Sequence, residues 1–237
     1  KIEVSLEGYY KTMDNLIEYK DGASFFDSQT DWQDKVHVGR GWSYGGELLI
    51  EKKMGKTTGW IGYTLSWTNR QFDSINFGQS YPYRYDRRHD IGIAITHEIN
   101  DRINFGIVWV YGTGNAVTLG LESYSSFNSS LVNDISNFNL NPSPFGYNQD
   151  NVNVSTVNHI ESRNNYRMPA YHRLDVSINM KKEKKWGERT WSFGLYNAYS
   201  RQNPFYLQFT RNENGDPQLS QFSLFPLIPS FTYSFKF

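Results

Sequence analysis

The sequence predicts an all-β protein, a transmembrane antiparallel β-barrel with about eight strands in this chain. Three observations lead to this prediction. Apolar and polar residues alternate in segment after segment, these segments are longer than the strands of soluble sheets, and the connections between them alternate between short and long. No run approaches the roughly 18 consecutive apolar residues that a membrane-spanning helix needs.

The alternation has a period of two residues, as expected for strands with one apolar and one polar face. In the opening segment, Ile2 and Val4 point to one side, and Glu3 and Ser5 point to the other. Each segment has about 10 to 14 residues, close to the 9–11 that a tilted strand needs to cross a bilayer, whereas soluble strands have five or six. The segments with this pattern are 1–11, 41–52, 59–70, 87–100, 102–112, 171–181, 190–200 and 230–237.

The connections also fit a membrane barrel, in which short turns face the periplasm and long loops face the exterior. Short connections are predicted at 54–57, 99–101 and 182–188, and long ones at 13–38, 71–86 and 114–167. We expect 114–167 to be a long extracellular loop. If the first strand runs outward, the C-terminal Phe237 lies on the periplasmic side. A hairpin between the last two strands is expected to turn at Asn214-Gly215.

The composition supports this interpretation and excludes several classes of function. The 24 basic and 24 acidic residues balance, so we expect no nucleic-acid partner. A mean hydropathy of −0.65 is typical of a soluble protein, but 17 Tyr, 16 Phe and 7 Trp suit a barrel whose rings collect where lipid meets water. The sequence contains no cysteine, nucleophile-elbow serine or phosphate-binding glycine loop, and its five histidines are dispersed. We therefore expect neither an enzyme nor a bound metal or cofactor.

Charged residues on the polar side of the predicted strands are the candidate site residues. They could line a path for a solute, or they could brace the inner wall as ion pairs, since a buried charge needs a partner. We favour ion pairs. The candidates in the lumen are Glu47, Glu51, Arg70, Arg88, Asp90, Arg173 and Asp175.

The last segment ends in alternating aromatic residues, Phe231, Tyr233, Phe235 and Phe237. This ending resembles the recognition signal that the outer-membrane barrel-assembly machinery reads. The simpler alternative is that these residues form an ordinary lipid-facing edge. The two roles are compatible, because the assembly signal would use the same outward face.

Four stretches of the chain resemble the C-terminal barrel of TonB-dependent outer-membrane receptors. They are GYTLSWTNRQFDSINFGQSYPYRYDRRHDIGIAI at 62–95, NNYRMPAYHRLDVSINMKK at 164–182, SFGLYNAYSRQNPFY at 192–206 and LFPLIPSFTYSFKF at 224–237. The likeness covers essentially the whole chain, and the order of the motifs carries it more than any one of them.

The resemblance implies a 22-stranded barrel with an N-terminal plug and a TonB box that couples uptake to the inner-membrane proton gradient. The eight strands seen here would form the last third of that barrel. The implied function is import of a scarce nutrient, such as a metal chelate, vitamin, glycan or peptide. The implied partners are outer-membrane lipid, the remaining barrel and plug, TonB (through the N-terminal part that is absent here), the barrel-assembly machinery and surface lipoproteins.

Two alternatives remain open at this point. The chain could form a complete eight-stranded outer-membrane barrel with an adhesion or structural role, or it could be a scaffold subunit of a larger envelope complex. Each of these interpretations requires hydrocarbon, and not a second protein layer, to cover the apolar side chains of the strands.

Overall fold

The computed structural model describes residues 1–20, 31–120, 122–127, 154–214 and 216–237. Eight long strands form one antiparallel sheet and follow one another in chain order, and the short strand β4 (Tyr81–Pro82) pairs with β3 at one end. The long strands are β1 (Ile2–Tyr19), β2 (Val36–Lys52), β3 (Thr57–Gln71), β5 (His89–Asn100), β6 (Ile103–Gly112), β11 (Tyr171–Lys184), β12 (Gly187–Tyr196) and β15 (Ile228–Lys236).

Each predicted strand is present, so the all-β prediction and the strand count are confirmed. The main difference is length, because β1 has 18 residues and β2 has 17. The alternation in the sequence breaks near residue 12 because a β-bulge shifts the register between Met13 and Leu16. Asn15 within the bulge has a φ of 55°, a left-handed conformation that Asn tolerates better than most residues.

The pairing register brings most apolar residues of the long strands to one side of the sheet, here called the apolar face. One row runs Val4–Ile50–Ile61–Ile93–Trp109–Leu174 across six neighbouring strands. The opposite side, here called the polar face, has rows such as Glu7–Glu47–Thr64–Asp90. The predicted division of residues between two faces is therefore confirmed by the register.

Nothing in the described part of the chain covers the apolar face. Val4 is 64% exposed, Leu6 is 80% exposed and Phe231 is 57% exposed. The hydrophobic cluster among the described residues is small and consists of Phe72, Ile75 and Tyr81. The apolar side chains therefore do not meet in the core of a sandwich.

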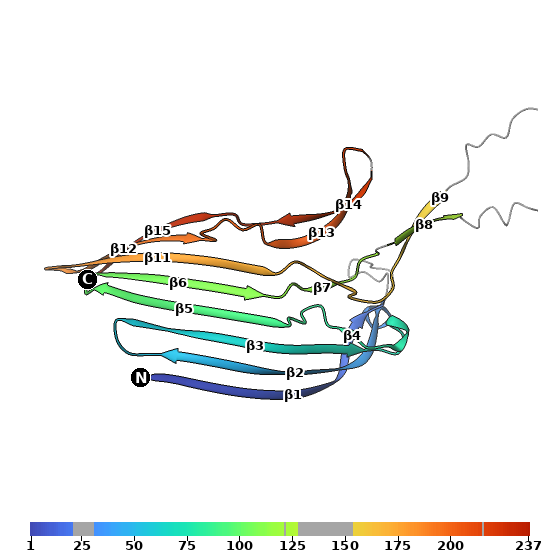
Figure 1. The fold of residues 1–237 in the computed structure, drawn as a ribbon, viewed down its shortest axis with the longest axis horizontal. Helices are drawn as coiled ribbons and strands as arrows, with labels where there is room; N and C mark the ends of the chain where they lie inside the picture. Colours follow the sequence, from blue (N-terminus) through green and yellow to red (C-terminus); the bar gives the residue numbers. More distant parts are fainter. Residues whose placement is uncertain (21–30, 121, 128–153, 215) are drawn as a thin grey trace, which may run out of the picture.

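Short and long connections lie at opposite ends of the sheet. The short turns at 53–56, 101–102 and 185–186 lie at the same end as both termini, whereas the long connections lie at the other end (Figure 1). The long connections carry four paired short strands and the β13–β14 hairpin. These elements are β7 (Ala116–Val117) with β10 (Tyr166–Arg167), β8 (Glu122–Phe127) with β9 (Val154–His159), and β13 (Pro204–Arg211) with β14 (Pro217–Ser223).

The sheet has two free edges in the described part of the chain. β1 pairs only with β2, and β15 pairs only with β12. No helix among the described residues is long and apolar enough to cross a membrane.

Candidate functional site

A cluster of charged and aromatic side chains lies on the polar face at the end of the long connections. Its centre is the Glu18 carboxylate near the end of β1. This carboxylate accepts hydrogen bonds from Arg163 Nε at 2.9 Å, Arg70 Nη1 at 3.2 Å and the Tyr81 hydroxyl at 2.9 Å. Arg163 Nη2 also lies 2.7 Å from a Glu18 oxygen. Two guanidinium groups thus share one carboxylate.

The bulge in β1 explains how Glu18 reaches this cluster. The register shift between Met13 and Leu16 turns Leu16 and Glu18 to the polar face. Leu16 then packs against the core cluster of Phe72, Ile75 and Tyr81. The close packing requires glycine at position 39, because a Cβ there would lie 2.4 Å from Phe72 Cδ1.

Tyr81 is the buried member of the cluster, with 2% of its surface exposed. Burial raises the pKa of its hydroxyl, and the hydrogen bond to the Glu18 carboxylate raises it further. The phenol therefore stays protonated and remains a hydrogen-bond donor to Glu18. Arg70 lies over the ring of the next tyrosine, Tyr83, with its guanidinium carbon 3.7 Å from the ring centre.

Two neighbouring cavities open beside Arg163. The arginine–tyrosine cavity has a volume of about 540 Å³. Its lining includes three arginines and three tyrosines, which are Tyr19, Arg70, Tyr83, Arg84, Tyr85 and Arg163. Because Glu18 is the only acid among the described residues that line it, this cavity suits a solute with anionic and aromatic or planar groups.

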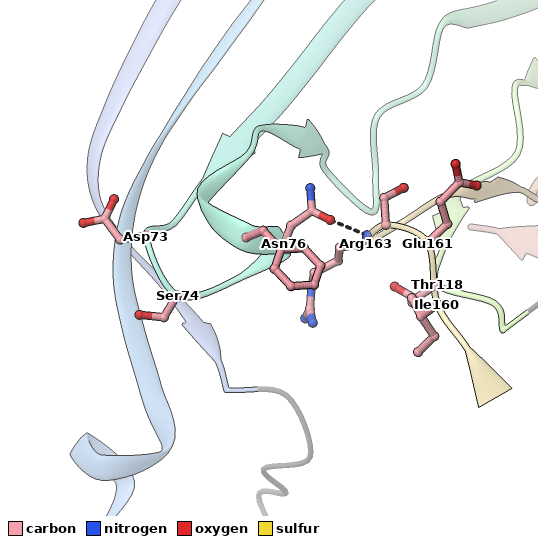
Figure 2. Close-up of a pocket in the computed structure, with 9 residues that line it drawn as sticks. Asp73, Ser74, Asn76, Thr118, Ile160, Glu161 and Arg163 are labelled. Carbon is pink, nitrogen blue, oxygen red and sulfur yellow. Dashed lines mark hydrogen bonds between the residues drawn. The ribbon is translucent and has the colours of Figure 1, made fainter. Parts of the chain in front are cut away.

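The second cavity, shown in Figure 2, has a volume of about 600 Å³ and lies between the 73–77 segment and the 160–163 segment. The two segments are joined by a hydrogen bond of 2.8 Å from the Arg163 backbone N–H to Asn76 Oδ1. Phe77, which lines this cavity, is 92% exposed and has a φ of 55°. A left-handed, exposed phenylalanine is unusual, and such strain often marks a functional position.

A second charged cluster holds the long connections against the end of β3. Asp86, 2% exposed, pairs with Arg167 at 2.7 Å and with Arg88 at 3.2 Å. The Thr68 backbone N–H donates to the same carboxylate at 2.7 Å. Arg167 also donates to the Asp86 carbonyl oxygen. Since Arg167 belongs to β10, this carboxylate fixes a segment distant in sequence beside β3.

A third cluster contains the predicted residues Arg173 and Asp175, which pair with each other at 2.9 Å. Arg173 also donates to the Tyr196 hydroxyl at 2.7 Å and lies over the Tyr196 ring at 4.1 Å. Asp175 accepts a hydrogen bond of 2.9 Å from the backbone N–H of Asn197, which is 1% exposed. The side chain of Asn197 donates to two carbonyl oxygens, one of them that of Phe225. The pair thus anchors the connection between β12 and β15.

The other candidates in the lumen do not pair with one another. Glu51 lies 3.1 Å from Lys53, Asp90 lies 3.1 Å from Arg87, Arg70 lies 3.2 Å from Glu18, and Arg88 lies 3.2 Å from Asp86. Arg88 precedes β5, and its guanidinium lies over Trp67, a residue of the apolar face, at 4.3 Å. Glu47 lies on the polar face opposite Glu7 and has no ion pair within the described ranges.

The sequence did not single out Glu18, Asp86, Arg163 or Arg167. All four lie in segments predicted as long connections, where no alternation assigns a side chain to a face. The dense run of arginines and tyrosines at 81–88 was the one feature of the sequence that could have indicated a charged site in these connections.

The aromatic residues at the end of the chain lie on the apolar face. Phe231 is opposite Phe193, Tyr233 is opposite Trp191 and Phe235 is opposite Arg189. Phe237 follows β15 and is 98% exposed. The predicted role of these four residues in assembly remains a prediction.

Comparison with known proteins gives one informative result. No protein-family model matches the chain, and no curated protein matches it. Among solved structures, the chain is similar to the ferripyoverdine receptor of the outer membrane of Pseudomonas aeruginosa, solved bound to ferripyoverdine, with 10% sequence identity and a TM-score of 0.50. The match covers 98% of this chain and 24% of the receptor, so the chain spans about a quarter of its length. At this identity the likeness concerns the fold alone, which is that of part of an outer-membrane barrel.

Proposed function

We propose that this chain is part of an energy-coupled, TonB-dependent receptor of the bacterial outer membrane that imports a scarce nutrient. The observation that carries the proposal is the combination of an apolar face, continuous across the strands, with ligand-sized cavities at the end of the long connections. The proposed role is transport, not catalysis.

Physical chemistry supports the membrane part of this proposal. Apolar surface left in water costs about 25 cal/mol for each Å², and the apolar face is exposed across the sheet. Hydrocarbon removes this cost. A sheet in lipid also cannot leave strand edges unpaired, because each free N–H or C=O group there costs several kcal/mol.

The free edges of β1 and β15 therefore support a larger barrel. A complete eight-stranded barrel would pair β1 with β15, and these strands do not pair within the described residues. Additional strands of a 22-stranded barrel would satisfy both edges. A plug would lie against the polar face, and TonB would act through that part of the receptor.

The proposed orientation places the long connections, including 114–167, outside the cell. The short turns and the end of β15 then lie in the periplasm, where the barrel-assembly machinery would meet the final aromatic residues. The cavities around Arg163 face the exterior in this orientation and would be the first contact with the solute. Surface lipoproteins could cover the same end.

A strain that lacks the gene tests the proposal. We expect the intact gene product to be several times larger than the 27.7 kDa of this chain and to stay in the outer membrane after carbonate extraction. We expect the deletion strain to grow poorly when one nutrient is limiting, in a screen of ferric chelates, cobalamin, glycans and peptides, and the gene to restore growth only in cells with TonB. A carbonate-soluble product, or uptake that does not depend on TonB, would overturn the proposal.

A further inference from the structure

Two cations lie side by side on the apolar face, at the end of the sheet that carries the short turns. Lys182 of β11 is directly opposite Arg189 of β12, and Arg189 is directly opposite Phe235 of β15. The same register places Met180 opposite Trp191 in the row next to them. The two cations therefore project from the side of the sheet that carries the lipid-facing residues.

This arrangement has no acidic partner in the described part of the chain. Neither Lys182 nor Arg189 takes part in an ion pair among those residues. The nearby acids Glu183 and Glu188 are opposite each other on the polar face. Lys182 and Arg189 are like charges directly opposite each other, and such a pair destabilises a sheet. Arg189 Nε is, in addition, shielded from solvent without a hydrogen-bond acceptor, which is costly for a charged group. An anion would relieve both costs.

Aromatic rings border this pair of cations. Trp191 and Tyr233 lie opposite each other with ring centres 4.7 Å apart, and Phe235 and Phe237 lie 6.3 Å apart. Trp and Tyr on a lipid-facing surface lie at the level of the headgroups. Lys182 and Arg189 are one row nearer to the end of the sheet than Trp191 and Tyr233. This row therefore lies at the level of the lipid phosphate groups.

We propose that Lys182 and Arg189 bind the phosphodiester of an anionic phospholipid. This inference rests on the membrane location proposed above. The planar guanidinium of Arg189 suits two phosphate oxygens, and Lys182 supplies a point charge on its flexible stem. The occupant is a lipid and not free phosphate, because its acyl chains would lie along the adjoining apolar rows of Met180, Trp191 and Phe193.

The test uses the intact protein purified from outer membranes and reconstituted in nanodiscs of phosphatidylglycerol and phosphatidylcholine. Native mass spectrometry then measures which lipids stay bound. We expect phosphatidylglycerol to be retained. The Lys182→Gln/Arg189→Gln variant should bind it roughly 30-fold more weakly, because each cation near the membrane surface contributes about fivefold and the two factors multiply. Lys182→Arg/Arg189→Lys should restore most of it.

The matched control is Lys56→Gln/Lys181→Gln, which removes one exposed lysine from a short turn and one from the polar face at the same end of the sheet. It should leave lipid retention unchanged. Equal losses in both double variants, no loss in Lys182→Gln/Arg189→Gln, or displacement of the lipid by millimolar inorganic phosphate would each overturn the inference.

Two outcomes separate this inference from the proposed function. A protein found only in the soluble fraction overturns both, whereas unchanged lipid retention in a membrane-inserted variant overturns the inference alone. If the double variant does not fold, Lys182→Gln alone is measured, since Lys182 is exposed, and about a fivefold loss is expected. No loss in that variant would again contradict the lipid site.

Discussion

Glu18 and Arg163 are 145 residues apart in the chain, yet the Glu18 carboxylate lies 2.9 Å from Arg163 Nε and 2.7 Å from Arg163 Nη2. This two-pronged contact joins the end of β1 to the segment that precedes β11. Because Tyr81 and Arg70 bind the same carboxylate, Glu18 joins two of the long connections, those that carry Tyr81 and Arg163, to the sheet. The contact organises the region in which both cavities lie.

Replacing Glu18 with Gln should destabilise this region. The change removes the negative charge that the guanidinium groups of Arg70 and Arg163 share, and both groups are largely buried. We expect a loss of about 1–3 kcal/mol, seen as a lower melting temperature of the detergent-solubilised protein and faster proteolysis of the long connections. Glu47→Gln is the control, because Glu47 makes no ion pair among the described residues; it should change stability by less than about 0.5 kcal/mol. Equal effects of both changes would contradict the role of Glu18.

Replacing Arg84 with Ala should weaken solute binding without lowering stability. Arg84 is exposed and lines the arginine–tyrosine cavity, so its loss removes a cation from the cavity wall and little packing. We expect half-maximal uptake to need about a tenfold higher solute concentration, because the variant loses one charge-assisted contact with the solute. Arg87→Ala serves as the comparison, because Arg87 pairs with Asp90 and does not line the cavity. Unchanged uptake by the Arg84 variant would show that this cavity is not the solute site.

Replacing Phe237 with Ser should reduce assembly in the outer membrane. Phe237 is 98% exposed, so the change removes almost no contact within the chain. A lower yield of folded barrel, measured by the heat-dependent shift in gel mobility, would therefore report recognition during assembly. The control is Trp186→Ser, which removes another exposed aromatic residue, in a short turn outside β15. Normal insertion of the Phe237 variant would remove the reason for assigning a signal.

Epitope tags should establish the orientation of the sheet. A tag in the 114–167 connection is expected to react with antibody on intact cells, since long connections face outward in membrane barrels. A tag in the short turn at 185–186 should react only after the cells are opened. The reverse pattern would place the cavities in the periplasm and contradict a role in capturing solutes from outside.

The sequence alone located all eight long strands and assigned residues to the two faces. This was possible because antiparallel pairing keeps directly opposed residues on one face, so a period of two residues carries across the whole sheet. The Val4–Ile50–Ile61 row shows this directly. A hairpin near Asn214 was also predicted, but β13 and β14 form a sheet of their own between β12 and β15, and Gly215 of the predicted turn lies outside the described residues. The Asn212 side chain accepts backbone hydrogen bonds from Asn214 and Asp216 there.

The clusters at the long connections could not be found in this way. The bulge at Asn15 reverses which side chains face the polar side, and the sequence offers no periodic signal for it. Glu18 was therefore assigned to a loop. The contacts of Asp86 with Arg167 likewise depend on how two distant segments fold over the end of the sheet, which local pattern does not specify.

The most direct test of this account is the accessibility of single spin labels along β5. The chain contains no cysteine, so cysteines introduced one at a time from residue 91 to residue 96 provide single labelling sites within it. In reconstituted membranes we predict an alternating pattern. Labels that replace Ile91, Ile93 and Ile95 should be accessible to oxygen dissolved in lipid, and labels that replace Gly92, Ala94 and Thr96 should not. Accessibility without this alternation, or equal exposure of all six positions to a water-soluble relaxation agent, would contradict a lipid-facing sheet.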